Sequence, residues 1–165
     1  MTIHVVFVCL GNICRSPSAQ GVFERLVSTA GLAHAISADS CGTAAFNVGK
    51  NPDPRAITAC EQHGYDIRDQ VARQIHDSDY ETAHYILGMD AMNLRNIRSW
   101  APTGYGGELE LLKHYSAINR KAEIPDPYYG DDQQFTRVIG VIEEACQGLL
   151  DHIIRQHGLD ESRQD

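Results

Sequence analysis

The sequence predicts an α/β fold, a three-layer sandwich in which helices cover both faces of a central four-stranded parallel sheet. Two observations lead to this prediction. Short runs of β-branched and aromatic residues alternate along the chain with longer segments in which apolar residues recur every three or four positions. The first of these runs, Val5 to Val8, also leads through a glycine-containing loop directly into such a segment. Strands that alternate with helices in this way are typical of parallel sheets.

The loop that follows the first strand, from Cys9 to Arg15, is predicted to bind an anion. A helix is expected to begin at Ser16, a favoured N-cap residue, with Pro17 in its first turn and an apolar periodicity that continues to Ala30. The unpaired N–H groups at the N-terminus of such a helix carry partial positive charge and attract anions.

Two side chains of this loop suit attack on a bound oxyanion. The field of the loop and the helix stabilises a thiolate on Cys9, which makes this residue a candidate nucleophile. The planar guanidinium of Arg15 matches two oxygens of a phosphate at once. A simple packing role for Cys9 is the alternative, since most free cysteines are buried, but packing does not explain Arg15 at the mouth of a buried strand.

The remaining elements are predicted from short-range signals. Further strands are expected at 36–40, 85–89 and 108–112, and further helices at 54–63, 78–82, 90–98 and 135–153. Pro54 begins the second helix, Gly64 follows its end, and Asp90 is expected to cap the fourth. The segment 100–107 is predicted to be a loop, with Trp100 as a packing residue.

The composition is that of one ordinary globular domain. The chain has 165 residues, of which 42% are hydrophobic and 22% charged, so we expect a single domain at 1–157 followed by a polar tail at 158–165. The net charge of −8 opposes binding to nucleic acid and to anionic membranes, since both need positive patches. The apolar runs are too short for membrane insertion.

The cysteine content points to a cytoplasmic protein. Five cysteines, an odd number, indicate reduced thiols. The N-terminus lacks the basic region of a secretory signal, which favours the same location. A zinc site is disfavoured, because Cys9 and Cys14 are not complemented by a second close pair of cysteines or histidines. We therefore expect no metal and no cofactor.

Three segments of the chain resemble the low-molecular-weight protein tyrosine phosphatases. Residues 9–17, Cys-Leu-Gly-Asn-Ile-Cys-Arg-Ser-Pro, match the phosphate-binding loop of that family without interruption. Residues 126–130, Asp-Pro-Tyr-Tyr-Gly, are similar to its acid loop, and residues 71–75 to its middle segment. The resemblance extends over nearly the whole chain. It implies a cytoplasmic hydrolase that removes phosphate from phosphotyrosine and from small aryl phosphates through a phosphocysteine intermediate.

The resemblance also implies the roles of individual residues. Cys9 would be the nucleophile, Arg15 the phosphate clamp and Asp126 the general acid and base. Ser40 and Gln70 would support the loop. Phosphate and substrate would be held by Leu10, Gly11, Asn12, Ile13, Cys14, Ser16, Phe46, Tyr128 and Tyr129.

Residue chemistry alone is less specific at three of these positions. Asp126 before Pro127 indicates only a turn, and Phe46 would be assigned to the core. Many members of the family have a histidine where this chain has Gln70. A glutamine can donate a hydrogen bond to Asn12, but it cannot become cationic.

Three other functions compete with this interpretation. The protein-arginine phosphatases are similar in this loop but have threonine in place of Ile13, whose apolar side chain favours phosphotyrosine. A thioredoxin-coupled arsenate reductase needs a relay pair of cysteines, whereas Cys60 and Cys146 stand alone. A module that binds phosphotyrosine without hydrolysing it would not need the nucleophile, the clamp and the acid together. We expect a phosphotyrosine-containing protein as substrate and the chain as a monomer or weak dimer.

Overall fold

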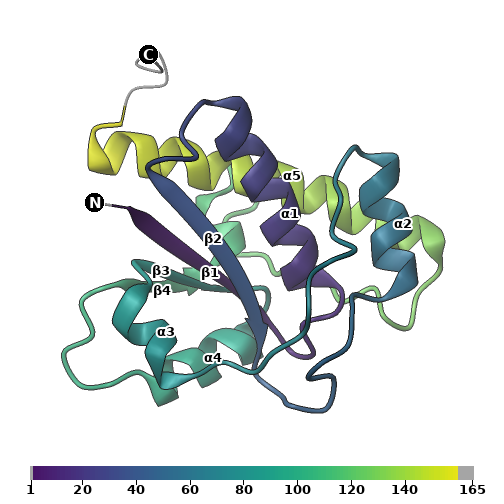
Figure 1. Cartoon of the computed structure of the whole chain (residues 1–165), viewed down its shortest axis with the longest axis horizontal. Helices are drawn as coiled ribbons and strands as arrows, with labels where there is room; N and C mark the ends of the chain where they lie inside the picture. Colours follow the sequence, from purple (N-terminus) through teal and green to yellow (C-terminus); the bar gives the residue numbers. More distant parts are fainter. Residues whose placement is uncertain (1, 160–165) are drawn as a thin grey trace.

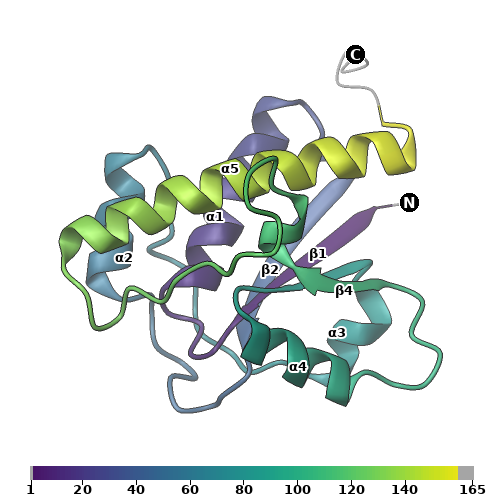
Figure 2. The ribbon, with the colours of Figure 1, turned by 180° about the vertical axis from the view of Figure 1, so that it is seen from behind.

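The structure, a computed structural model, describes residues 2–159 and contains a parallel sheet with helices on both faces (Figures 1 and 2). The strands are β1 (Ile3–Cys9), β2 (Ile36–Gly42), β3 (Tyr85–Gly88) and β4 (Glu108–Leu111). Their order in the sheet is β2, β1, β3, β4, and every neighbouring pair is parallel. The three-layer α/β fold is therefore confirmed, whereas residues 160–165 of the predicted tail lie outside the described residues.

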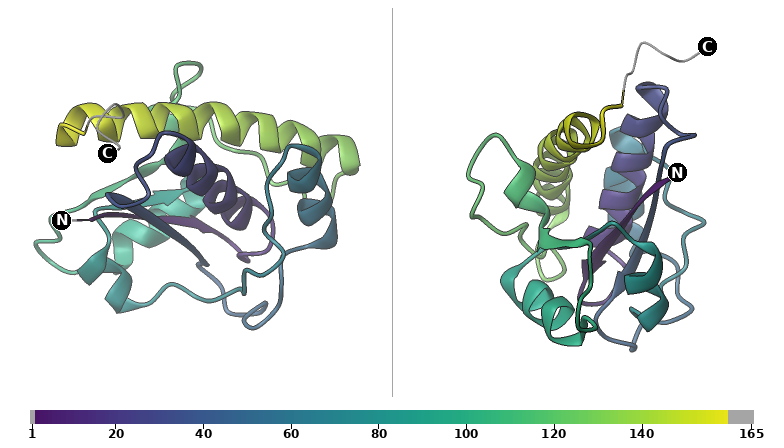
Figure 3. Two further views of the ribbon diagram at one scale, coloured as in Figure 1. Left: turned by 45° about the horizontal axis from the view of Figure 1, so that its top comes forward. Right: turned by 90° about the vertical axis from the view of Figure 1, so that its left-hand side faces the viewer.

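The helices form the two outer layers. They are α1 (Arg15–Thr29), α2 (Pro54–Gln62), α3 (Asp77–Thr82), α4 (Ala91–Trp100), α5 (Asp132–His157) and the short 3-10 helix η1 (Leu112–Tyr115). Helices α1 and α5 cover one face of the sheet and α3 and α4 the other (Figure 3). Helix α2 packs beside α5.

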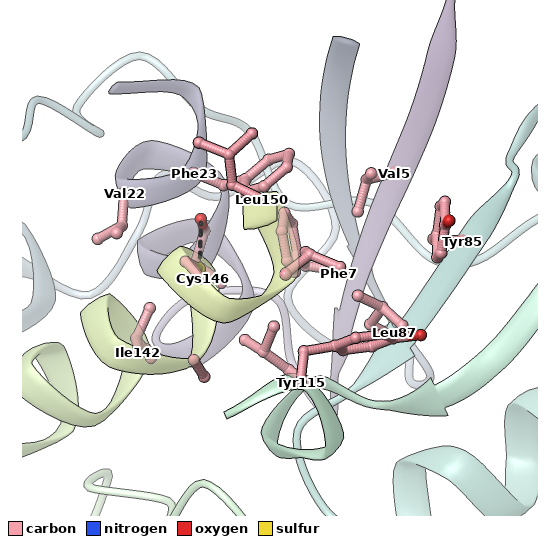
Figure 4. Packing of buried hydrophobic residues seen from close by; sticks show 14 of the residues in the cluster. Val5, Phe7, Val22, Phe23, Tyr85, Leu87, Tyr115, Ile142, Cys146 and Leu150 are labelled. Carbon is pink, nitrogen blue, oxygen red and sulfur yellow. Dashed lines mark hydrogen bonds between the residues drawn. The ribbon is translucent and has the colours of Figure 1, made fainter. Parts of the chain in front are cut away.

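Strand β1 is buried on both faces from Val5 to Val8, which explains the apolar run there. Val5 and Phe7 belong to the larger core cluster, which includes residues of α1 and α5. Val6 and Val8 belong to a smaller cluster with residues of α3 and α4. In the larger cluster the rings of Phe7 and Phe23 meet edge to face, with centroids 5.6 Å apart (Figure 4). A central strand covered by helices on both sides needs apolar side chains at every position.

Helix α1 begins earlier than the sequence indicated. Its first residue is Arg15 and its N-cap is Cys14, so the expectation that Ser16 caps the helix is wrong. No side chain caps this helix end. The Ser16 hydroxyl lies instead beside the sulfur of Cys9. A helix start without a side-chain cap leaves backbone N–H groups free for another acceptor.

Two boundaries near α4 test the sequence interpretation further. Asp90 caps α4 by accepting a hydrogen bond from the Asn93 N–H at 2.9 Å, as expected. Trp100, however, is the last helical residue, and its side chain is exposed, so its assignment to a loop and its packing role are wrong. Residues 98–100 at the end of α4 are all exposed, and 45% of Trp100 is accessible to solvent.

The strand order places the loop after β1 at the switch point of the sheet. The chain leaves β1 through α1 to reach β2 on one side, and β3 lies on the other side. In open parallel sheets, ligands bind in the crevice outside the carboxyl ends of the strands at such a reversal. Cys9 is the last residue of β1, so the loop from Cys9 to Arg15 lies at that crevice.

Replacement of Leu149 by alanine should destabilise the fold without altering this crevice. Leu149 in α5 is fully buried in the larger core cluster. The change should lower the free energy of unfolding by about 2–5 kcal/mol, because it removes apolar contacts and leaves a cavity. Urea denaturation measures the loss, and Arg137→Ala on the exposed face of the same helix is the control. Equal midpoints for the two variants would contradict this packing of α5.

Candidate active site

A cavity of about 230 Å³ opens at the carboxyl end of β1. It is lined by Cys9, Leu10, Gly11, Ile13, Cys14, Arg15, Phe46, Asn47, Asp126, Tyr128 and Tyr129. Sequence analysis proposed all of these residues except Asn47. The other four proposed residues, Asn12, Ser16, Ser40 and Gln70, do not line the cavity but form a hydrogen-bonded network behind its floor.

The sulfur of Cys9 is surrounded by hydrogen-bond donors. The backbone N–H of Asn12 donates to Sγ at 3.3 Å, and the Ser16 hydroxyl lies 3.0 Å from it. Asn12 Nδ2 donates to Ser16 Oγ at 2.8 Å, and the Ser16 hydroxyl can in turn donate to the sulfur or to the Cys41 carbonyl, which lies 3.3 Å from Oγ. Donors aimed at a sulfur atom stabilise a thiolate more than a thiol.

Asn12 sets the shape of the loop. Its φ of 57° lies in the left-handed region, which asparagine tolerates better than most residues. Its Nδ2 also donates to Ser40 Oγ at 3.0 Å, and its Oδ1 accepts from the backbone N–H of Arg73 at 3.0 Å. These bonds join the loop to β2 and to the segment before α3, and they hold the loop curled around the sulfur of Cys9.

Gln70 supports this network through Ser40 and makes no direct hydrogen bond to Asn12. Ser40 Oγ donates to Gln70 Oε1 at 3.4 Å, and Gln70 Nε2 donates to the carbonyl of Pro17 at 3.0 Å. The Ser40 hydroxyl therefore links the side-chain amides of Asn12 and Gln70.

Arg15 is a buried cation, with only 3% of its side chain exposed. Its Nη1 donates to Asp90 Oδ2 at 2.9 Å and to the carbonyl of Ile124 at 3.0 Å. Its Nη2 lies 3.5 Å from Asp126 Oδ2 at the edge of the cavity. One side of the guanidinium is therefore held by the protein, while the other faces the place where an oxyanion would bind.

Asp126 lines the cavity next to Arg15 and is half-exposed, with 44% of its side chain accessible. Its Oδ1 accepts from the backbone N–H of Tyr128 at 3.1 Å, and Oδ2 points towards Arg15. The residue does sit in a turn, as its sequence alone suggests, but that turn carries the carboxylate to the cavity. A carboxyl group in this position can exchange a proton with a group bound beside Cys9.

Exposed aromatic rings form the walls of the cavity. Tyr129 is 95% exposed and Phe46 66% exposed, so the interpretation of Phe46 as a core residue is wrong. The rings of Tyr128 and Tyr129 meet edge to face at 5.0 Å. Such walls favour a flat, planar ligand.

Asn47 is the lining residue that sequence analysis missed. Its Nδ2 donates to the carbonyl of Gly11 at 3.3 Å. A Cβ atom on Gly11 would lie 2.6 Å from that nitrogen, so a larger residue there would displace the Asn47 amide from this contact. The polar loop composition around Asn47 was visible, but its contact with a residue 36 positions earlier was not.

Cys14 shares the cavity with Cys9. Its side chain is largely buried among residues of α2 and α5, and this burial raises the pKa of its thiol well above the ordinary value. The other three cysteines, Cys41, Cys60 and Cys146, are fully buried within the core, and all five thiols are free. Cys14 is thus the thiol that shares the cavity with the candidate nucleophile.

Comparisons with known proteins agree on one family. The sequence profile described as "Low molecular weight phosphotyrosine protein phosphatase" matches residues 4–159. The protein of that name from Schizosaccharomyces pombe is 42% identical over 152 residues, which cover 92% of this chain and 97% of that protein. A protein tyrosine phosphatase structure from Entamoeba histolytica has a TM-score of 0.87 and 32% identity, covering 95% and 99% of the two chains. The structure of a Drosophila arginine phosphatase has a TM-score of 0.84 and 32% identity, covering 90% and 96%.

Mild peroxide should join Cys9 and Cys14 in a disulfide. Peroxide converts the Cys9 thiolate to a sulfenic acid, and attack by the Cys14 sulfur forms the disulfide with loss of water. Because burial raises the pKa of Cys14, this second step should become faster as the pH rises. Peptide mapping by mass spectrometry before and after dithiothreitol follows the linkage, with Cys14→Ser as the control. The expectation is wrong if the free Cys9 thiol is recovered equally well in that variant.

Proposed function

The chain belongs to the low molecular weight phosphotyrosine protein phosphatase family, and on this premise we propose that it hydrolyses phosphotyrosine in proteins, and small aryl phosphates, through a phosphocysteine on Cys9. It is a cysteine-dependent hydrolase of phosphoric monoesters. The observation that carries the residue assignments is that the sulfur and the guanidinium of one loop line the same cavity as a carboxylate more than a hundred residues away in the sequence.

In the first step the thiolate of Cys9 attacks phosphorus in line with the leaving oxygen. Arg15 and the loop N–H groups hold the equatorial oxygens and stabilise the charge of the transition state. The sulfur–phosphorus bond forms as the bond from phosphorus to the phenolic oxygen breaks. The protonated carboxyl of Asp126 donates its proton to that oxygen, and the tyrosine side chain leaves as a neutral phenol.

In the second step water releases the phosphate. Asp126, now a carboxylate, takes a proton from a water molecule that attacks the phosphorus, and the phosphorus–sulfur bond breaks. The Ser16 hydroxyl, 3.0 Å from the sulfur, stabilises the thiolate as it leaves. Inorganic phosphate is the product, and both Cys9 and Asp126 return to their starting protonation states. Side chains of this chain supply every proton transfer.

The cavity walls support an aromatic phosphoester as substrate. Phe46, Tyr128 and Tyr129 present ring surfaces around the opening, and the apolar side chain of Ile13 also lines the cavity. Phosphoarginine is the second candidate, because a structural relative is an arginine phosphatase. An arsenate reductase is disfavoured, since Cys60 and Cys146 are both fully buried and lie in separate core clusters.

The proposal also covers the cellular location and the domain organisation of the protein. Among residues 2–159 no helix is long and apolar enough to span a bilayer. Five free cysteines support a reducing compartment, so we propose a cytoplasmic location. We also propose that residues 1–157 act as one domain followed by a polar tail at 158–165. The expected monomer or weak dimer stays a prediction.

A phosphopeptide panel tests the substrate class. Of peptides carrying phosphotyrosine, phosphoserine or phosphoarginine, only the phosphotyrosine peptide should release phosphate, because the aromatic walls and Ile13 suit a phenyl ring. Cys9→Ser should abolish release yet leave the fold intact, since an alcohol is not ionised near neutral pH. Preferential hydrolysis of phosphoarginine would overturn the substrate assignment. Binding of the phosphotyrosine peptide without turnover would indicate a binding module.

Asp126→Ala should slow the hydrolysis of substrates with a poor leaving group more than that of substrates with a good one. A tyrosine phenolate, whose conjugate acid has a pKa of about 10, leaves poorly without a proton, whereas a more acidic phenol leaves almost unaided. We expect kcat/KM for phosphotyrosine peptides to fall by roughly 10²- to 10⁴-fold, with a much smaller loss for an activated aryl phosphate. Asp132→Ala, an exposed residue at the start of α5, is the control. Equal losses on both substrates would show that another group is the acid.

A further inference from the structure

Arg55, the second residue of α2, does not line the cavity but contacts the loop that carries Asp126. Its guanidinium carbon lies 5.5 Å from the ring centroid of Tyr128 in that loop and 4.6 Å from the ring centroid of Phe135 in α5. Its Nη1 also donates to the carbonyl of Gly130 at 3.4 Å. One side chain therefore connects α2, the acid loop and the start of α5, which lie side by side (Figure 2).

The orientation of Arg55 is fixed by Asp53. Arg55 Nε donates to Oδ1 at 3.1 Å and Nη2 donates to Oδ2 at 2.9 Å, a two-point pairing that only a planar guanidinium makes. Asp53 is itself fixed, because it caps α2 by accepting the Arg55 N–H at 2.9 Å. Burial alone would raise the pKa of Asp53, but the hydrogen bonds from Arg55 outweigh it and lower the pKa. Arg55 thus contacts the acid loop with its guanidinium oriented by Asp53.

The acid loop has outside contacts at two places: Arg15 Nη2 lies 3.5 Å from Asp126 Oδ2, and Arg55 contacts Tyr128 and Gly130. The hydrogen bonds within the loop are local, from Gly130 N–H to the Pro127 carbonyl and from Tyr128 N–H to Asp126 Oδ1. Tyr128 is therefore bonded directly to the carboxylate that must transfer the proton. Arg55 also donates to the Gly130 carbonyl, and the Gly130 N–H is bonded to Pro127, so Arg55 supports the turn that presents the Tyr128 N–H to Asp126.

We propose that Arg55 is a positioning residue, which acts through Tyr128 to hold Asp126 where it can protonate the leaving group. This inference rests on the proposed function, since it assigns Asp126 the role of acid. Misplacement of a catalytic group by about 1 Å can cost on the order of 10²-fold in rate. The loss should be confined to reactions that need the proton.

The chain provides a matched control for this residue. Arg68 pairs with Asp66 as Arg55 pairs with Asp53, with Nε and Nη2 at 3.0 and 2.9 Å from the two carboxylate oxygens. Its own N–H also donates to Asp66 Oδ1 at 3.1 Å. The side chain of Arg68, however, is 63% exposed and does not line the cavity. Arg55→Lys and Arg68→Lys therefore each disturb an arginine–aspartate pair of the same geometry, but only Arg55 contacts the acid loop.

The first measurement is kcat/KM, which reports the steps up to formation of the phosphocysteine. Arg55→Lys keeps the positive charge but loses the planar fork. It should lower kcat/KM for a phosphotyrosine peptide about tenfold or more, and for an activated aryl phosphate less than about threefold. Arg68→Lys should change neither value. Equal losses of Arg55→Lys on both substrates would overturn the proposal.

A double-mutant cycle separates positioning from general damage. In an Asp126→Ala background, Arg55→Lys should cause no further loss with the peptide, because the group that it positions is gone. Inhibition by inorganic phosphate should match the wild type, since Cys9, Arg15 and their loop are unaltered. A further loss of the same size in that background, or weakened phosphate inhibition, would overturn the proposal. Failure of the proposed function would appear in the wild type itself, as an absence of phosphotyrosine hydrolysis.

Discussion

The buried positive charge of Arg15 is the constraint on which the site depends. A cation taken out of water is tolerated only where partners surround it. Those partners are the carboxylate of Asp90 after β3, the carbonyl of Ile124 in the long loop after η1, and the carboxylate of Asp126 beyond it. At the ends of the paired strands β1 and β3, this guanidinium therefore binds a segment more than a hundred residues from Arg15, and the acid belongs to that segment.

A second network fixes the geometry of the nucleophile. Asn12 holds its left-handed conformation through bonds to Ser16, Ser40 and the Arg73 backbone, and Gln70 extends this chain to the first turn of α1. The neutral amide of Gln70 accepts from Ser40 and donates to a carbonyl, so the support works without a cation. The nucleophile Cys9 and the clamp Arg15 are thus held by separate sets of hydrogen bonds. Those of Asn12 hold the loop around Cys9, and those of Asp90 and Ile124 hold Arg15.

The fold was largely predictable because its signals are local. The burial of β1 on two faces appears in the sequence as an unbroken apolar run, and the helices appear as apolar residues at intervals of three and four. Helix starts were harder. Ser16 is a residue type that commonly caps helices, yet its hydroxyl lies beside the sulfur of Cys9. The N-terminus of α1 therefore has no side-chain cap, and its N–H groups are left for an anion. Local preference gave way at the one helix end that the site requires.

The sequence by itself determined the chemistry of the site. A cysteine, an arginine and a loop with glycine and asparagine between them lie within seven residues, where short-range geometry decides which groups meet. Only the tertiary structure decided the surroundings. Asn47 meets Gly11, Arg55 meets Tyr128, and Phe46 stands exposed at the rim, because separate elements end at the same edge of the sheet. Contacts across such distances depend on how helices and strands pack, and no local pattern of residues records that packing.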